Sequence, residues 1–522
     1  MSDGRSDNAR TIETGGLLVA SRRLMSDQVT PVLGYRRLVS EDDRTAPSFL
    51  LESVEAGTSV GRYSFLGTSP SVEVIARATN VSIRDHRAGT SSDIVHEDPL
   101  EVVRSLSEGL VIDPDQLAEN GIVPRTFAGG WVGYAGFDTI RYLEPGCLPF
   151  DSAPDDDRNL PDLHMGLYLR IVVFDHVSKT MHCVCMEPLK AHASSEAASE
   201  VACDHLDGLV RSLATHSVPL KAGEISLETS VFPSEPGCPT TSREKFIEDV
   251  GTVQEYIRNG DAFQVVLSQR FRRSTQVDPF DIYRALRIVN PSPYQIYLQA
   301  ADSILISASP EILCRVRDRV VTNRPLAGTR RRGATGAEDE RMEQELLSDQ
   351  KERAEHVMLV DLGRNDLGKV SEDASIEIPV CMEVERYSHV MHISSTVTGI
   401  LRDRLDAWDA LRATLPVGTV SGAPKIRSIQ IIDELEPVRR GPYAGGIGLV
   451  GLDGNMDIAL ALRTMVVPIS LHDPEQGTWQ VDLQAGAGIV LDSDPASEHQ
   501  ECLNKAAALS RAIDLAESSL PR

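Results

Sequence analysis

Hydrophobic residues recur along the chain with two different periods, which predict a mixture of helices and strands. Phe246, Val250, Val253 and Ile257 repeat at helical spacing and predict a helix. An Asn-Gly pair follows closely and can end that helix, because both residues tolerate a left-handed backbone. Residues 191–213 are rich in Ala, Ser and Glu and predict a second helix at the surface.

Short apolar stretches bounded by turn residues predict strands. Residues 72–76, 169–174 and 262–271 are stretches of this kind. Successive side chains of a strand point to opposite faces, so Gln264 and Ser268 share one face of the third stretch.

These patterns divide the chain into four parts. Residues 1–15 are polar, and we expect them to be disordered, whereas residues 16–213 form a first folded region. Residues 214–242 contain four prolines and little periodicity, which predicts a linker. Residues 243–516 form a second folded region, and most of the recognisable chemistry lies there.

Composition narrows the class of protein. The chain has 522 residues, and its 41% of hydrophobic residues is typical of a globular protein of two or three domains. A net charge of -25 argues against a nucleic-acid or membrane-surface protein, and no apolar run approaches the ~18 residues of a membrane span. The eight cysteines are scattered without a CxxC pair, and we see no secretory signal. We therefore expect a cytoplasmic protein.

Two pairs of carboxylates stand out in the second region. Glu352 and Glu355 are three residues apart, as are Glu498 and Glu501, so each pair occupies one face of a predicted helix. If the two faces meet, four crowded negative charges require a cation, and oxygen ligands suit Mg²⁺. The spacing by itself is more typical of two solvated charged faces.

Several other positions are chemically suggestive and have ordinary structural explanations as well. Segments around Gly328, Thr419 and Gly486 offer backbone N–H groups or hydroxyls to an anion, although each is also typical of a turn. None matches a P-loop or a dinucleotide-binding motif. Single residues such as Glu311 and His392 can equally be a local cap and a buried core histidine.

Taken together and in order, the segments resemble the chorismate-utilising enzyme family. The matching stretches are GDAFQVVLSQRF, SASPE, NRPLAGTRRRG, DQKERAEHVMLVDLGRNDLGKV, VMHISSTVTG, PVGTVSGAPKIRSIQIIDELEP, RRGPYAGGIG and QAGAGIVLDSDPASEHQECLNKA. Through SFLLESVEAGTSVGRYSFLG, GGWVGYAGFD and NPSPYQIYLQ, the chain is similar to the anthranilate synthase component I branch over nearly its whole length.

The resemblance implies an α+β fold in which two packed antiparallel β-sheets are flanked by helices and hold the active site between them. It implies that Glu355 and Glu501 bind Mg²⁺ directly, with Glu352 and Glu498 beside them. It also implies a set of residues around chorismate: Gly328, Thr329, Tyr443, Arg463, Gly486, Ala487, Gly488 and Lys505.

The implied reaction has two halves. Ammonia attacks C2 of the chorismate ring while the C4 hydroxyl leaves, and Glu311 is the acid that protonates this poor leaving group. The aminodeoxyisochorismate then loses pyruvate to give anthranilate, the first committed intermediate of tryptophan biosynthesis. His392 and Thr419 match positions associated with this second half.

Two positions distinguish the branches of the family. Relatives that add water carry a lysine base where this chain has Gln264, and an amide cannot act as that base. Relatives that make aminodeoxychorismate carry a nucleophilic lysine where this chain has Ala327. Both positions therefore favour ammonia as the nucleophile.

The chain shows no Cys-His-acid unit for glutamine hydrolysis. The resemblance therefore implies a separate glutamine amidotransferase subunit as the source of ammonia, in a heterotetramer.

The resemblance further implies that tryptophan inhibits from a pocket in the first region, contacted by Ser53, Pro293, Tyr294 and Gln295. Gln295 departs from the family, which usually has methionine there.

Two alternatives stay open at this point. An aminodeoxyisochorismate synthase would use the same nucleophile and stop before pyruvate loss. A catalytically inactive, tryptophan-sensing partner protein would require a gap in the acid or metal set, and the sequence shows none.

Overall fold

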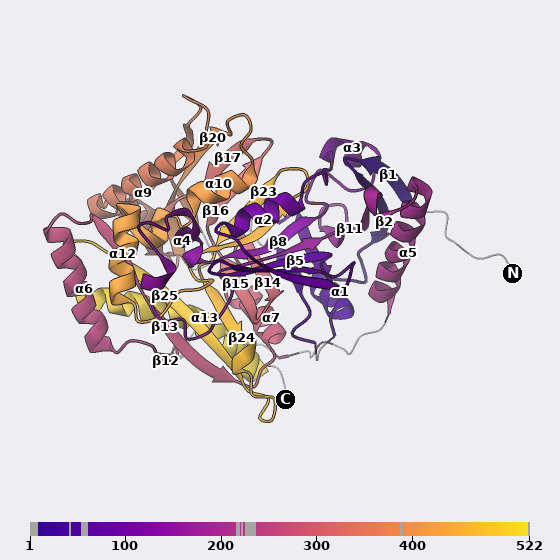
Figure 1. Ribbon diagram of the computed structural model, residues 1–522. Coiled ribbons are helices and arrows are strands. Elements are labelled where there is room, and N and C mark those ends of the chain that lie inside the picture. The colour runs from indigo at the N-terminus through magenta and orange to yellow at the C-terminus, as the bar shows by residue number, and fades with distance from the viewer. Residues whose placement is uncertain are drawn as a thin grey trace.

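The computed structural model describes residues 9–40, 43–53, 61–215, 220, 223–224, 236–386 and 390–519. Within these residues the chain forms two large antiparallel sheets with helices packed around them (Figure 1). This confirms the α+β architecture expected from the sequence. Helix α5 (Ser195–Ala214) lies at one end of the molecule, and α6 (Arg243–Arg258), α9 (Gln350–Gly368) and α12 (Lys425–Leu435) lie at the other.

The first sheet contains thirteen of the described strands. In hydrogen-bonded order they are β1 (Arg10–Thr14), β2 (Leu17–Met25), β11 (Thr180–Pro188), β10 (Arg170–Asp175), β4 (Tyr63–Thr68), β3 (Ser48–Glu52), β14 (Tyr294–Ala300), β15 (Ser303–Ser309), β24 (Thr464–Pro468), β25 (Trp479–Ile489), β13 (Gln264–Thr275) and β12 (Cys238–Pro239), with β21 (Gly422–Ala423) also pairing with β13.

The second sheet contains twelve of the described strands. In order they are β18 (Leu326–Arg331), β20 (Val390–Ile400), β17 (Val320–Asn323), β16 (Ile312–Arg317), β23 (Met456–Leu460), β22 (Gly446–Gly451), β8 (Gly130–Ala135), β9 (Leu163–Tyr168), β5 (Val72–Arg77), β6 (Asn80–Asp85) and β7 (Thr90–Val95), with β19 (Glu377–Arg386) also pairing with β20.

Both sheets draw strands from both sequence regions. In the first sheet β3 pairs with β14, so that Glu52 lies opposite Gln295. In the second sheet β22 pairs with β8, so that Gly448 lies opposite Gly133. The boundary between the two sequence regions is therefore not a boundary between sheets.

Helices cover the outer face of the first sheet. Helices α1 (Pro31–Leu38), α5, α7 (Pro279–Val289) and α13 (Pro495–Ser519) contact its strands and share one hydrophobic core with them. A larger core contains side chains from both sheets. The other described helices are α2 (Pro99–Leu106), α3 (Pro114–Glu119), α4 (Ile140–Leu143), α8 (Gly336–Ser348), α10 (Ala407–Thr414) and α11 (Gly418–Ser421).

Most elements expected from periodicity are present. The predicted helix around Phe246 is α6, which ends with Asn259 at its C-cap, and the predicted strand at 262–271 is β13. The stretches at 72–76, 169–174 and 191–213 correspond to β5, β10 and α5. The described helices include none that is long and apolar enough to cross a membrane.

The expectation of disorder over residues 1–15 is wrong for its second half. Residues 10–14 form β1, which pairs with β2 at the edge of the first sheet. The strand was missed because four of its five residues stay at least partly accessible to solvent, so it carries little hydrophobic signal. Residues 1–8 and most of the predicted linker at 214–242 lie outside the described residues.

Candidate active site

Glu311 is a buried carboxyl group held by a hydroxyl. It lies between β15 and β16 and is 3% exposed. Thr419, in helix α11, donates a hydrogen bond from Oγ1 to Glu311 Oε1 at 2.9 Å. Burial raises the pKa of Glu311 to about 8, although the bonds from Thr419 and the Leu326 backbone act in the opposite direction. Glu311 therefore keeps its proton at neutral pH.

His392 is a neutral imidazole beside Gly328 and Thr329. Strand β20 places it opposite Thr329 on β18, and its Nδ1 lies 2.9 Å from the Gly328 carbonyl oxygen and 3.1 Å from Thr329 Oγ1. A carbonyl oxygen can only accept, so Nδ1 carries the proton and Nε2 carries the lone pair. Burial, reinforced by the charge of Arg463, lowers the pKa of His392 to about 4. The ring therefore stays uncharged at neutral pH.

Strands β13 and β25 carry the glycine-rich segment and Gln264. Successive side chains of a strand point to opposite faces. In β25, Gly486 and Gly488 therefore lie on one face and Ala487 lies on the other, the face that also carries the buried Leu483 and Ala485. Gly488 lies opposite Val266 and leaves room for Gln264, because a Cβ on Gly488 would lie 2.6 Å from Gln264 Nε2. That nitrogen donates to Glu355 Oε1 at 3.1 Å.

Two further predicted residues converge on Gly486. Lys505, on α13, donates from Nζ to the Gly486 carbonyl oxygen at 2.9 Å. The hydroxyl of Tyr443 would lie 3.2 Å from a Cβ added to Gly486, and Tyr443 is 3% exposed. A larger side chain at position 486 would therefore fill the space in front of the tyrosine.

Arg463 lies in the connection between β23 and β24 with a φ of 48°. This left-handed conformation is uncommon for a residue with a side chain and is often found at functional sites. Its Nη1 lies 3.4 Å from Asn290 Oδ1, and its charge acts on His392. Arg463 thus belongs to the same neighbourhood as the histidine.

The four predicted carboxylates lie on two helices, as their spacing indicated. Glu352 and Glu355 are in α9, and Glu498 and Glu501 are in α13, which begins with Pro495 after Asp494. Burial, and then the charges of Glu352 and Glu501, raise the pKa of Glu355 despite its hydrogen bond from Gln264. The two helical pairs therefore lie close enough to repel each other.

Two of these carboxylates are paired with cations in the structure. Glu352 accepts a hydrogen bond from Arg330 Nη1 at 2.9 Å, and Glu501 lies 2.6 Å from Lys505 Nζ. Among the described residues no three His, Cys, Asp or Glu side chains are gathered closely enough to hold a metal ion. The donor chemistry and the excess of negative charge fit Mg²⁺, whereas these side-chain positions do not form a coordination set.

The predicted catalytic and substrate residues are linked into one connected site. The Leu326 backbone hydrogen-bonds to Glu311, and Leu326 begins β18, the strand that carries Gly328 and Thr329. The charges of Arg463 and Lys505 both act on His392. Ser268 shares the face of β13 with Gln264, as predicted, and donates to Glu436.

The residues predicted to bind tryptophan meet where β3 ends and β14 begins. Continuing the β3–β14 register from Glu52 and Gln295 brings Ser53 opposite Tyr294. The Tyr294 hydroxyl donates to Asp457 Oδ1 and accepts from Arg315 Nη2, both at 2.7 Å. Residues 54–60, which follow Ser53, lie outside the described residues.

Gln295 points away from that meeting point. It shares a face of β14 with Tyr297, which packs in the core on the helix side of the sheet. Its Nε2 donates to the Asn290 carbonyl oxygen at 2.7 Å, and its buried Oε1 has no hydrogen-bond partner among the described residues. Gln295 is therefore close to Ser53 through its backbone, and its side chain extends to the other face of the strand.

Sequence reasoning missed the Glu436–Arg440 ion pair that supports the site. Both side chains are buried, and Arg440 Nε donates to Glu436 Oε2 at 2.8 Å. Arg440 also donates to the carbonyl oxygens of Val266 and Val420, each at 2.7 Å. The four-residue spacing was visible in the sequence, but nothing in it indicated burial.

Comparisons with known proteins identify the family of the chain. Residues 47–511 match the family model described as chorismate binding enzyme. The chain is 54% identical to the chloroplastic anthranilate synthase alpha subunit 1 of Oryza sativa subsp. indica, covering 98% of this chain and 90% of that protein. It is 52% identical to the corresponding protein of Arabidopsis thaliana, covering 96% and 86%.

A solved structure is also similar. The crystal structure of anthranilate synthase component I from Streptococcus pneumoniae TIGR4 matches with a TM-score of 0.71 and 35% identity, covering 94% of this chain and 99% of that chain.

The expectation of a cytoplasmic location is wrong. The similar plant proteins, at 50–54% identity, are chloroplastic. Cysteine usage and net charge report redox conditions and solubility, which different compartments share, so they could not distinguish one compartment from another.

Proposed function

The chain belongs to the family of chorismate-binding enzymes, as a large subunit of anthranilate synthase in tryptophan biosynthesis, and on this premise we propose how its residues convert chorismate and ammonia to anthranilate and pyruvate. The observation that carries the proposal is the buried Glu311, whose pKa of about 8 keeps a transferable proton at neutral pH. Residues 243–516 supply the catalytic groups, and residues 16–213 supply much of the regulatory region.

In the first half of the reaction Glu311 is the general acid. A C–N bond forms between ammonia and C2 of the ring, and the C–O bond at C4 breaks. Glu311 gives its proton to the departing hydroxyl, which leaves as water while the ring double bonds shift from C2 toward C4. The newly bonded ammonium group then loses a proton, and Glu311 regains one. Thr419 holds the carboxyl group through its 2.9 Å hydrogen bond and orients it toward the leaving group.

In the second half His392 is the general base. Its neutral ring, with the lone pair on Nε2, takes the proton from C2 of aminodeoxyisochorismate as the C3–O bond breaks and the ring becomes aromatic. The released enolpyruvate takes up a proton at its methylene carbon and becomes pyruvate. The bond from Nδ1 to the Gly328 carbonyl fixes the tautomer that this step needs. Arg463 and Tyr443 bind the carboxylate of the enolpyruvyl arm, because a guanidinium pairs with a carboxylate through two hydrogen bonds.

Glu355 and Glu501 bind Mg²⁺ directly, with Glu352 and Glu498 beside them. When bound, Mg²⁺ supplies a positive charge for the ring carboxylate of chorismate. Support comes from the pKa values of Glu355 and Glu498, which burial and neighbouring carboxylates raise. A cation would relieve this repulsion. The pairing of Glu352 with Arg330 and of Glu501 with Lys505 implies that these cations shift when Mg²⁺ and substrate bind.

The nucleophile is ammonia delivered by a partner. Gln264 bears no basic group, which suits a nucleophile that needs no deprotonation, and Ala327 bears no nucleophile of its own. As a large subunit the chain has a partner component. We infer that this partner is a glutamine amidotransferase and that the two form a heterotetramer.

Tryptophan inhibits from the junction of β3 and β14, where Ser53, Pro293 and Tyr294 contact it. Support comes from the register that brings Ser53 opposite Tyr294. The Gln295 amide points toward α7, so it acts on the pocket only through the backbone. Replacement of the usual methionine therefore leaves feedback in place.

Product identification tests this function directly. The purified chain should convert chorismate to fluorescent anthranilate with Mg²⁺ and an ammonium salt, and excess EDTA should abolish the reaction. Glutamine should support no turnover unless the partner is added. Accumulation of aminodeoxyisochorismate without anthranilate would instead identify the enzyme that stops before pyruvate loss.

A further inference from the structure

A groove opens between α1 and α5 on the helix-covered face of the first sheet. It has a volume of about 260 Å³, and its walls come from α1, β4, β10 and α5. The residues that matter here are Leu38, Leu66, Arg170, His205, Gly208 and Leu209, and we call this hollow the Arg170 groove. None of the residues placed in the catalytic site or in the tryptophan pocket lines it.

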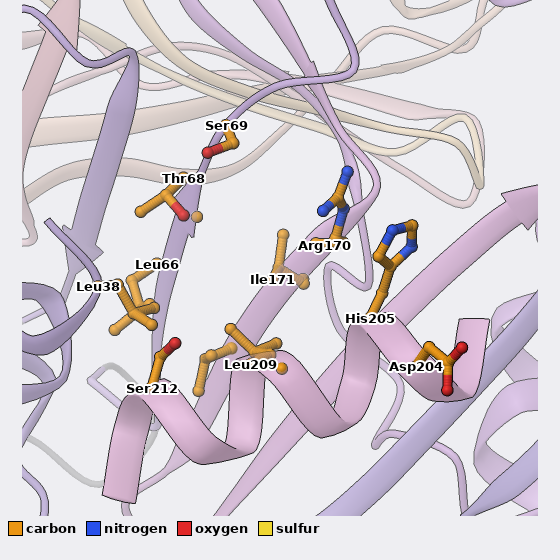
Figure 2. A pocket seen from close by; sticks show the side chains of 13 residues that line it. Leu38, Leu66, Thr68, Ser69, Arg170, Ile171, Asp204, His205, Leu209 and Ser212 are labelled. Atoms are coloured by element: carbon orange, nitrogen blue, oxygen red, sulfur yellow. The ribbon is translucent and has the colours of Figure 1, made fainter. Parts of the chain in front are cut away.

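The Arg170 groove has an apolar end and a polar end (Figure 2). Leu38 and Leu66 lie at one end, Leu209 and Ile171 lie in the middle, and the Arg170 guanidinium and the His205 ring lie toward the other end. A second cavity of about 280 Å³ shares Arg170 and His205 with the groove. These two side chains therefore form a wall between two hollows.

Arg170 is unpaired within the part of the chain that the structure describes. Among the described residues its guanidinium makes no ion pair or side-chain hydrogen bond, although the side chain is partly buried and the protein carries a net charge of -25. Glu187 lines the second cavity, and its carboxylate is hydrogen-bonded to His205 Nδ1 at 2.8 Å and to His192 Nε2 at 3.3 Å. Asp204 lines the groove as well but is exposed to solvent. Within the part of the chain that the structure describes, this guanidinium is therefore available to pair with the carboxylate of a ligand.

Gly208 keeps the groove open. It lies inside helix α5, where glycine is less favourable than alanine, and a Cβ at this position would meet nothing within 4 Å. A side chain here would therefore improve the helix without a clash. Such a side chain would occupy space that belongs to the groove.

We propose that the Arg170 groove binds a small aromatic carboxylate, with Arg170 on the carboxylate and the ring against the three leucines. A planar guanidinium and a carboxylate match through two parallel hydrogen bonds. Contact with the leucines stabilises an apolar ring by removing it from water. A groove of this volume admits one or two fused rings but no larger group. A neutral ligand would leave the arginine unpaired.

Titration of the full chain with 2-naphthoate, followed by its fluorescence, tests the site. Wild type should bind one equivalent, and Arg170→Gln should weaken binding at least about tenfold, as expected for loss of a charge-assisted pair. Gly208→Leu should weaken it similarly by filling the groove, while its thermal unfolding temperature stays at or above that of wild type. Arg211→Gln, which removes an exposed charge from the same helix, is the matched control and should bind as wild type does.

Two further arms separate this site from the others. The neutral analogue 2-naphthylmethanol should lose no affinity in Arg170→Gln, and excess chorismate, which is not aromatic, should not displace 2-naphthoate from wild type. Ser53→Ala, which alters the proposed tryptophan pocket, should bind the probe as wild type does. Absence of saturable binding at millimolar probe would overturn the proposal. So would equal binding by wild type and either groove variant, displacement of the probe by chorismate, or loss of probe binding in Ser53→Ala.

Discussion

At the scale of single residues, burial decides which side chains of the site are charged. Glu311 and His392 have opposite charge types, yet burial keeps both neutral at pH 7, because it raises the pKa of the carboxyl and lowers that of the imidazole. One is thereby prepared to give a proton and the other to take one. This division of roles agrees with a two-step reaction that needs an acid first and a base second.

Glu311→Gln should lower kcat about 10²- to 10⁴-fold, because the amide keeps the shape of the side chain and loses the transferable proton. In the wild type the Glu311 carboxyl group is protonated at pH values below the pKa that it has in the folded protein. The rate at saturating chorismate and fixed NH₃ concentration should therefore fall as pH rises through about 8. A variant with the same rate and the same pH profile as wild type would remove Glu311 from the mechanism.

Glu355→Gln should abolish turnover by removing one charge from the carboxylate cluster and weakening its affinity for Mg²⁺. Titration with Mn²⁺, followed by electron paramagnetic resonance, should show the loss independently of activity. Glu372→Gln, a substitution of an exposed glutamate, is the control. Unchanged metal affinity in Glu355→Gln would show that the ligands lie elsewhere.

At the scale of elements, Arg440 connects three segments, two of which carry predicted site residues. Its guanidinium bonds to Val266 in β13, to Val420 in α11 and to Glu436 just after α12. Gln264 and Thr419 lie in the first two of these segments. The buried ion pair therefore links the strand that carries Gln264 to the helix that carries Thr419.

Arg440→Met should lower the free energy of unfolding by about 3–5 kcal/mol, because it leaves the buried Glu436 carboxylate without its cation. Urea denaturation measures this loss. Arg427→Met, which breaks the more exposed pair with Asp261, should cost no more than about 1 kcal/mol. The double variant Glu436→Met/Arg440→Met should regain part of the loss, and a double variant as unstable as the sum of both single changes would contradict the pairing.

At the scale of the whole molecule, the two sheets are linked where the tryptophan pocket is expected. Tyr294 belongs to the first sheet, but its hydroxyl bonds to Arg315 and Asp457 of the second. Arg315 lies in β16, the strand that begins directly after Glu311. A ligand that moves Tyr294 can therefore act on the strand next to the catalytic acid.

Tryptophan should inhibit the wild-type enzyme, and Ser53→Ala should weaken its binding. Tyr294→Phe should still bind tryptophan but respond to it less, because the Arg315–Asp457 pair at 3.0 Å remains while the link to the first sheet is lost. Equilibrium dialysis with radiolabelled tryptophan, alongside rate measurements, separates binding from inhibition. Gln295→Met should behave nearly as wild type, because that amide faces α7. Equal inhibition of wild type and Ser53→Ala would show that the pocket lies elsewhere.

Much of the local structure could be predicted from the sequence alone. The period around Phe246 predicted α6, the alternation in 262–271 placed Gln264 and Ser268 on one face of β13, and the spacing of the glutamates placed two on α9 and two on α13. These features depend on neighbours within a few residues. The ordered motifs identified the family for the same reason, since each is a continuous segment.

Only the tertiary structure decided which distant groups meet and how deeply they are buried. Three contacts depend on strand order and helix packing. They are the hydrogen bond from Arg330 to Glu352, the hydrogen bond from Gln295 to the end of α7, and the hydrogen bonds from Arg440 to neighbouring segments. The pKa values of Glu311 and His392 follow from desolvation, which is a property of the assembled core and of no local pattern. Sequence spacing determined which residues are adjacent on an element, and the fold determined the charge each one carries.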